Sequence, residues 1–112
     1  MAARPPAPRE KRGHLLTAAF WSLAVQASPA VAADVAYGEY LASECATCHR
    51  RDGQDKGIPS IVGWRPEQFV AALVAYRKKD RPNPIMQTIA GRLSDEDMKA
   101  LAAYYATLKP KP

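Results

Sequence analysis

The segment Cys45-Ala46-Thr47-Cys48-His49 constrains this chain more than any other feature of its sequence. Its C-x-x-C-H spacing is the signature of covalent c-type haem attachment. Two thiols about one helical turn apart can add across the two vinyl groups of one macrocycle, and the histidine that follows can place its imidazole beneath the iron. The motif therefore predicts one haem c bound through Cys45 and Cys48, with His49 as an iron ligand.

Three other structures use a closely spaced cysteine pair: a thioredoxin-like redox site, a short disulfide and part of a zinc site. The redox site needs a βαβ unit, and the chain shows no strand pattern. Zinc needs more protein ligands than the two cysteines and one histidine of residues 34–112. A simple disulfide remains an alternative. A domain of this size buries only about 60% of its unfolded surface, so a bound group would supplement its core.

The first 33 residues have the order of regions typical of a secretory signal peptide. A basic, proline-rich start is followed by the apolar run 15–25 and by small residues that end at Ala33. The run is about half the length that a membrane-spanning helix needs. We therefore expect cleavage after Ala32 or Ala33 and no stable membrane span afterwards, with an uncleaved anchor as the alternative. Export would place residues 34–112, as a single domain, in the bacterial periplasm.

Most of the basic excess of the chain lies in this leader. The whole sequence has 16 basic and 11 acidic side chains and a net charge of +5. Without the four basic and one acidic side chains of residues 1–33, the net charge of the rest is +2. A large basic face for nucleic acid is therefore not expected. The dense basic stretch 77–81 is either a solvated helix end or a steering patch for an acidic partner.

The spacing of apolar residues predicts an all-α fold with three main helices. The last begins with a capping box formed by Ser94 and Asp97. Residues 49–64 and the proline-rich segment that carries Met86 are predicted to be loops. We expect the helices over 34–45, from Pro66 to about Asp80, and from Ser94 to just before Pro110.

The second axial ligand of the iron must come from another residue type, because His49 is the only histidine after residue 33. Met98 lies on the apolar stripe of the last predicted helix, where a core role is sufficient. Met86 follows the proline-rich segment and can arch over the other face of the haem. We therefore expect Met86 as the iron ligand, with an open or different sixth site as the alternative. A thioether ligand raises the reduction potential, which suits an electron carrier.

Beyond the C-x-x-C-H motif, an ordered set of short motifs runs through residues 35–108. The set consists of Gly38-x-x-Leu41-x-x-x-Cys45-x-x-Cys48-His49-x-x-x-Gly53, Pro59-Ser60-Ile61-Val62-Gly63, Met86-x-x-x-Ala90-x-x-Leu93-Ser94-Asp95-Glu96-Asp97 and Leu101-Ala102-Ala103-Tyr104-Tyr105. In this order the motifs resemble class I cytochrome c. They are most similar to small bacterial periplasmic monohaem members, such as c553 and c4 cytochromes and the cytochrome subunit of flavocytochrome c sulfide dehydrogenases.

The resemblance implies a cytochrome c fold, with three main helices and loops around one covalently attached haem. It implies that the first helix crosses the last near Gly38 and Tyr104 or Tyr105. It also implies that the Pro59 carbonyl accepts a hydrogen bond from the His49 ring and fixes the ring's orientation.

Two functions of different classes fit these residues. The first is electron transfer to or from a redox protein, such as a dehydrogenase, a flavoprotein or a terminal oxidase, without catalysis by this chain. The carrier would be a soluble shuttle or the cytochrome subunit of a periplasmic dehydrogenase, of the sulfide or sulfite type for example. The alternative is a peroxidase-like or gas-binding haem protein. That function needs an open sixth site and usually a distal acid or base, for which no histidine remains.

Overall fold

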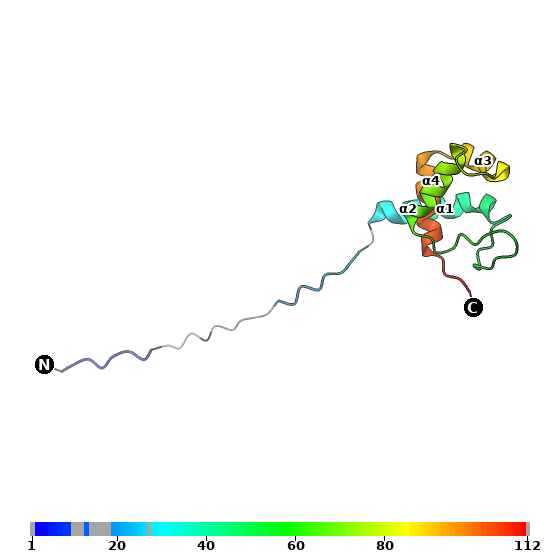
Figure 1. Ribbon diagram of the computed structural model, residues 1–112. Coiled ribbons are helices and arrows are strands. Elements are labelled where there is room, and N and C mark those ends of the chain that lie inside the picture. The colour runs from blue at the N-terminus through cyan, green and yellow to red at the C-terminus, as the bar shows by residue number, and fades with distance from the viewer. Residues whose placement is uncertain (1, 10–12, 14–18, 27, 112) are drawn as a thin grey trace.

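The computed structural model describes residues 2–9, 13, 19–26 and 28–111. This part of the chain contains four helices and no strand: α1 (Pro29–Cys45), α2 (Pro66–Arg77), α3 (Pro84–Gly91) and α4 (Asp95–Thr107). Figure 1 shows the four helices gathered in one body, with the described residues before Ser28 outside it. The all-α prediction is confirmed. None of the described helices combines the length and the apolar content that crossing a membrane requires.

The structure has one helix more than the three predicted, because Met86 lies in α3 and not in a loop. The Asn83 side chain caps this helix, and Pro84 takes its first position. Proline is favoured there because its fixed φ suits a helix and the first amide has no partner within the helix. The proline-rich segment that the sequence predicts as a break therefore starts a new helix.

Two helix ends also differ from the predicted ones. Helix α1 begins at Pro29 rather than Asp34, because proline at the first turn and the alanine-rich sequence after it both favour helix. Helix α2 ends at Arg77, and Lys79 takes a left-handed backbone conformation with a φ of 64° that turns the chain away. The predicted end of α2 near Asp80 is thus a few residues too late.

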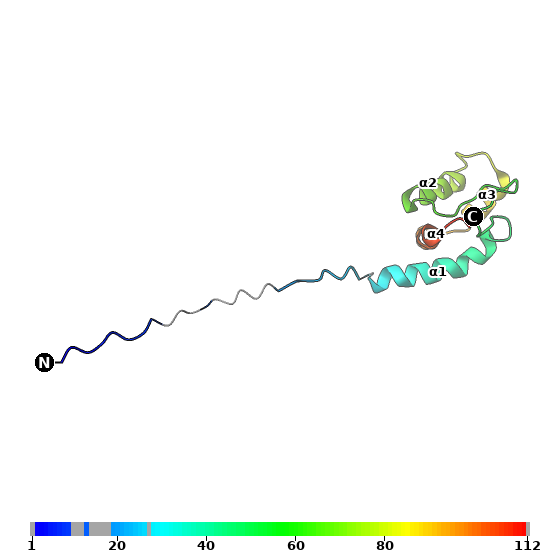
Figure 2. The ribbon, with the colours of Figure 1, turned by 90° about the horizontal axis from the view of Figure 1, so that it is seen from below.

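Helix α4 is the centre of the packing. It packs against both α1 and α2, whereas α1 and α2 do not pack against each other. Figure 2 shows α4 end-on between those two helices. The capping box predicted at its start is present: the Ser94 hydroxyl accepts from the Asp97 amide at 3.1 Å, and the Asp97 carboxylate accepts from the Ser94 amide at 2.9 Å. Its buried residues are Met98, Ala100, Leu101, Ala102, Tyr104 and Tyr105.

The crossing of α1 and α4 depends on Gly38. A Cβ atom at this position would lie 2.0 Å from the carbonyl oxygen of Ala100 and 2.8 Å from the Tyr104 Cβ. Such distances are far below van der Waals contact, so the two backbones meet at a point where no side chain fits. The crossing near Gly38 and Tyr104 that the resemblance implies is therefore present.

The loop between α1 and α2 is tied to the last turn of α4 and to the chain that follows it. The Tyr105 carbonyl accepts a hydrogen bond from the Gly63 amide at 3.0 Å, and the Asp52 carbonyl accepts one from the Lys111 amide at 2.9 Å. Gly53, with a φ of 79°, lies against Pro110. The segment after α4 therefore holds the first half of the loop, and the last turn of α4 holds the second half.

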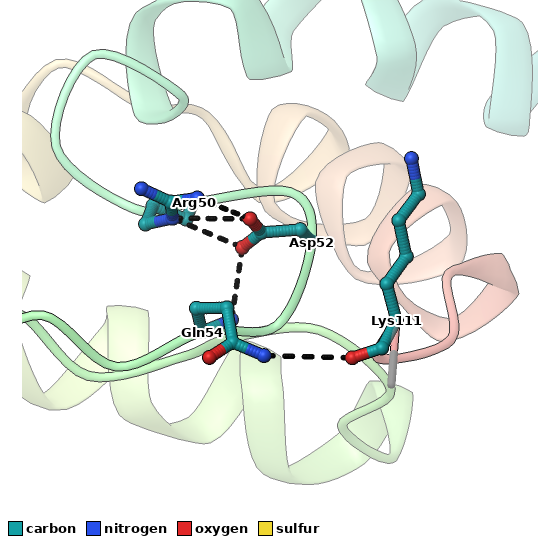
Figure 3. Close-up of polar contacts among 4 residues, drawn as sticks. All are labelled: Arg50, Asp52, Gln54 and Lys111. Atoms are coloured by element: carbon teal, nitrogen blue, oxygen red, sulfur yellow. Dashed lines mark hydrogen bonds and ion pairs between the residues drawn. The ribbon is translucent and has the colours of Figure 1, made fainter.

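Figure 3 shows the polar contacts that hold the first half of this loop. The Asp52 carboxylate pairs with the Arg50 guanidinium and accepts from the Gln54 amide at 2.9 Å, while the Gln54 side chain donates to the Lys111 carbonyl at 3.4 Å. Hydrogen bonds from Arg50 and the Gln54 amide lower the pKa of Asp52 to about 2. The carboxylate therefore keeps its charge, and the loop its contacts, well into the acid range.

Candidate haem site

A cavity of about 330 Å³ lies between the end of α1, the loop after it, α2 and α3. Most of its lining is apolar and comes from side chains that include Ile58, Ile61, Trp64, Phe69, Leu73 and Ile85. The residues that the sequence predicts for the cofactor all lie along this one cavity: Cys45, Cys48, His49, Pro59 and Met86. The fold thus brings the C-x-x-C-H motif and the distant methionine to a single site.

Cys45 is the last residue of α1, and Cys48 and His49 follow it in a tight turn. The amides of Cys48 and His49 donate to the Cys45 carbonyl at 3.2 and 2.8 Å, which keeps the three residues beside one another at the cavity. Both thiols are free, so the alternative of a short disulfide is not present in the structure. Burial raises the pKa of the Cys45 thiol, while Cys48 is exposed.

The His49 ring has a defined orientation. Its Nδ1 lies 2.7 Å from the carbonyl oxygen of Pro59, the contact that the resemblance implies. A carbonyl oxygen only accepts hydrogen bonds, so Nδ1 carries a proton, and in the neutral ring Nε2 is then the nitrogen with the free lone pair. That is the tautomer a metal-ligating histidine needs when its other nitrogen is held by a carbonyl.

The two methionines occupy different environments. Met86 lies in the first turn of α3, is partly buried and lines the cavity. Met98 lies in α4 and is fully buried in the hydrophobic core, at 0% exposure. Met86 therefore lies at the cavity, while Met98 packs in the core as its apolar pattern predicts.

The site has the chemistry that haem c requires. Its apolar lining matches a macrocycle, its two free thiols match two vinyl groups, and an imidazole and a thioether match the axial positions of an iron. Within the described residues, no group of three or more His, Cys, Asp or Glu side chains is placed to hold a bare metal ion. The zinc alternative therefore finds no support, and the residues present fit a haem.

Sequence reasoning did not foresee that two polar residues, Arg81 and Asn83, line the cavity. Arg81 lines it and stacks over the Tyr76 ring at 4.7 Å from the ring centroid. Asn83 also lines it and accepts a hydrogen bond from the Met86 amide at 3.0 Å. An Asn-Pro pair is a recognised helix start, so the signal for Asn83 was in the sequence, whereas the position of Arg81 depends on tertiary structure.

Comparison with known proteins agrees with this geometry. Residues 35–109 match the family model described as "Cytochrome c". The chain is 35% identical over 75 residues to the cytochrome subunit of sulfide dehydrogenase of Chlorobaculum tepidum, covering 66% of this chain and 68% of the relative. It is 42% identical over 72 residues to cytochrome c-553 of Helicobacter pylori, covering 62% and 75%.

A third relative is the thiosulfate dehydrogenase electron acceptor of Stutzerimonas stutzeri, with 42% identity over 74 residues. The match covers 63% of this chain and 33% of that longer protein. The family match covers nearly all the helical body, including both the C-x-x-C-H motif and Met86. This chain therefore belongs to the cytochrome c family, carries a covalently bound haem c and transfers electrons.

Proposed function

We propose that this chain is a periplasmic one-electron carrier with His49 and Met86 as the axial iron ligands and with thioether bonds at Cys45 and Cys48. The observation that carries the proposal is the convergence of these four side chains on one apolar cavity. When bound, the haem supplies a ferric/ferrous couple. Thioether ligation and a dry site both favour the ferrous state and so raise the reduction potential.

The residues around the ligands hold them in place and exclude water. The Pro59 carbonyl orients the His49 ring, and the apolar side chains of the loop, α2 and α3 keep solvent from the iron. Trp64 belongs to this wall, where its indole nitrogen donates to the Ser60 carbonyl at 3.1 Å.

A peroxidase-like function is the less favoured alternative. It needs an open iron position and usually a side chain that moves protons to or from bound peroxide. Met86 lies where it would close that position, and residues 34–112 contain no second histidine. We therefore propose that the chain performs no substrate chemistry of its own.

Replacing Met86 by alanine tests the ligand assignment. We expect the ferric variant to lose the weak far-red charge-transfer band that an iron–methionine bond produces. Its reduction potential should also fall by on the order of 0.1 V, since axial ligands set haem potentials over a range of about 0.8 V. Visible spectroscopy and a redox titration of the purified holoprotein measure both effects.

The matched control is Met98→Leu in α4. This substitution nearly conserves volume in the core, so it should cost less than about 1.5 kcal/mol of unfolding free energy and leave the far-red band intact. If Met98→Leu removed the band and Met86→Ala retained it, the two methionines would exchange roles. If the wild-type protein lacked the band and turned over peroxide rapidly, the enzyme hypothesis would replace the carrier.

The partner is proposed to be a redox protein with an acidic docking surface. Lys78 and Lys79 are exposed and follow α2 directly, beside Arg81 at the mouth of the cavity. The net charge of residues 34–112 is only +2, so attraction must come from this local cluster rather than from the whole molecule. The names of two relatives point to a dehydrogenase, either as a complex that includes this chain or as the donor to a soluble shuttle.

Charge reversal at Lys78 and Lys79 tests the docking cluster. With a reduced acidic flavoprotein as the electron donor, we expect the variant with glutamate at both positions to react roughly tenfold more slowly at low salt. The difference should vanish at high salt, where exposed charges are screened. Reversal of Lys99 and Lys109, which changes the net charge equally, should have a much smaller effect. Equal slowing by both pairs would mean that net charge, not this cluster, steers the encounter.

We also propose that residues 1–33 are removed as a signal peptide. Residues 1, 10–12, 14–18 and 27 of this leader lie outside the described residues. The described side chains of its apolar run are almost fully exposed, with Phe20 at 95% and Trp21 at 87%. They make no part of the core, as expected for a segment that the mature domain does not use. Cleavage after Ala32 or Ala33 would shorten α1 by its exposed first turn. Intact-mass analysis of the exported protein reads the cleavage position directly.

A further inference from the structure

We propose that Asn83 is the positioning residue that holds Met86 at the cavity, through its cap on α3. This inference rests on the proposed ligation by Met86. The Asn83 Oδ1 accepts a hydrogen bond from the backbone amide of Met86 itself, at 3.0 Å. That amide is the third of the helix and has no acceptor within it. The cap therefore fixes the backbone from which the thioether projects.

Helix α3 depends strongly on this cap. It has only eight residues, and helices below about 12 residues are marginal by themselves. Within the described structure its backbone lies close to α2 but not to α1 or α4, and Ala90 is its one buried residue. Its far end is held by an ion pair between Arg92 and Glu44 at 2.8 Å, in which both side chains are more than half exposed, so that pair contributes little.

The chain offers a way to remove the cap without moving the backbone. Asn83 precedes Pro84 and has an extended conformation, with φ at −169° and ψ at 105°. A residue before proline is confined to this region whatever its side chain. The hydrogen bond from the Gln87 amide to the Asn83 carbonyl, at 2.9 Å, is also independent of the side chain. Asn83→Ala thus removes the acceptor alone.

Competition with imidazole measures how firmly Met86 is held. Imidazole binds ferric iron only when the methionine leaves, so its apparent affinity reports the free energy of opening α3. Loss of a helix cap changes such an equilibrium about fivefold, within a range of roughly two- to thirtyfold. We expect the ferric Asn83→Ala holoprotein to bind imidazole about fivefold more tightly than wild type. Asn83→Asp, which keeps an oxygen acceptor, should stay close to wild type.

Ser94→Ala is the matched control. Ser94 makes the equivalent cap on α4, with its hydroxyl accepting from the Asp97 amide at 3.1 Å, but α4 carries no proposed iron ligand. We expect this variant to lower resistance to denaturant about as much as Asn83→Ala while its imidazole affinity stays within about twofold of wild type. The contrast separates local opening of α3 from general loss of stability.

Three outcomes would overturn the inference: unchanged imidazole affinity in Asn83→Ala, an equal rise in Ser94→Ala, or an equal rise in Asn83→Asp. If Asn83→Ala gave no holoprotein, Asn83→Thr, a weaker cap, should show a smaller rise in affinity, and an unchanged value would again reject the cap. Absence of the iron–methionine band from the wild-type protein would reject the proposed function instead, before any variant is compared.

Discussion

Gly38→Ala is expected to destabilise the holoprotein by about 3 kcal/mol or more, at the upper end of what overpacking costs in a protein core. The new methyl group would lie 2.0 Å from the Ala100 carbonyl oxygen and 2.6 Å from the Ala100 carbonyl carbon. Both are backbone atoms, so no rotation of a side chain relieves the clash and the two helices must separate. Denaturant unfolding followed by far-UV circular dichroism measures the loss.

Gly91→Ala provides the control for this substitution. Gly91 is also helical, but a Cβ atom there would meet no other atom within 4 Å. Alanine is the better helix former, so this variant should be unchanged or up to about 1 kcal/mol more stable. Equal destabilisation by the two substitutions would show that the α1–α4 crossing is not as tight as the structure indicates.

Replacing both Cys45 and Cys48 by alanine is expected to abolish covalent haem and, with it, the cooperative fold. A cavity of about 330 Å³ left empty would cost about 8 kcal/mol at about 24 cal/mol per Å³, an upper limit for a cavity that opens to solvent. Small domains have only about 5–15 kcal/mol of total stability. We therefore expect a chain with little fixed tertiary structure.

Two measurements check this expectation. A haem-peroxidase stain after denaturing electrophoresis should mark the wild-type protein and not the double variant. Near-ultraviolet circular dichroism and thermal unfolding should show an ordered, cooperative wild type and a variant without either property. A variant that lacked haem yet unfolded cooperatively would falsify the claim that the haem completes the core.

The residues that the sequence predicts for the cofactor lie along one cavity, and they could be predicted because the strongest signals in the sequence are local. The C-x-x-C-H motif needs only five consecutive residues, and the capping box of α4 needs four. The location of Met86 at the cavity also followed from its spacing, but its helix did not. The two nearby prolines, Pro82 and Pro84, predict a break in helical structure. A helix of only eight residues is also too short to show a clear apolar period.

What could not be predicted depends on contacts between distant segments. No sequence pattern predicts the hydrogen bond between Asp52 and Lys111. The same is true of the contact of Arg81 with the Tyr76 ring at the cavity. The earlier start of α1 has a different cause: helix propensity continues upstream through the small residues that also mark the predicted cleavage site. The same short segment thus fits both a cleavage site and the start of a helix, and only the cleavage site was predicted.

The central place of α4 has a consequence for the order in which the domain is completed. Helix α1, with the haem-attachment motif at its end, packs against no described helix other than α4, which is the last of the four described helices along the chain. The first helix therefore has no other helix to pack against until the segment that forms α4 is also available. Contacts between segments so far apart slow folding. Until α4 is in place, no other described helix packs against the helix that ends at the two thiols, so the order of folding sets when those thiols become fixed beside the cavity.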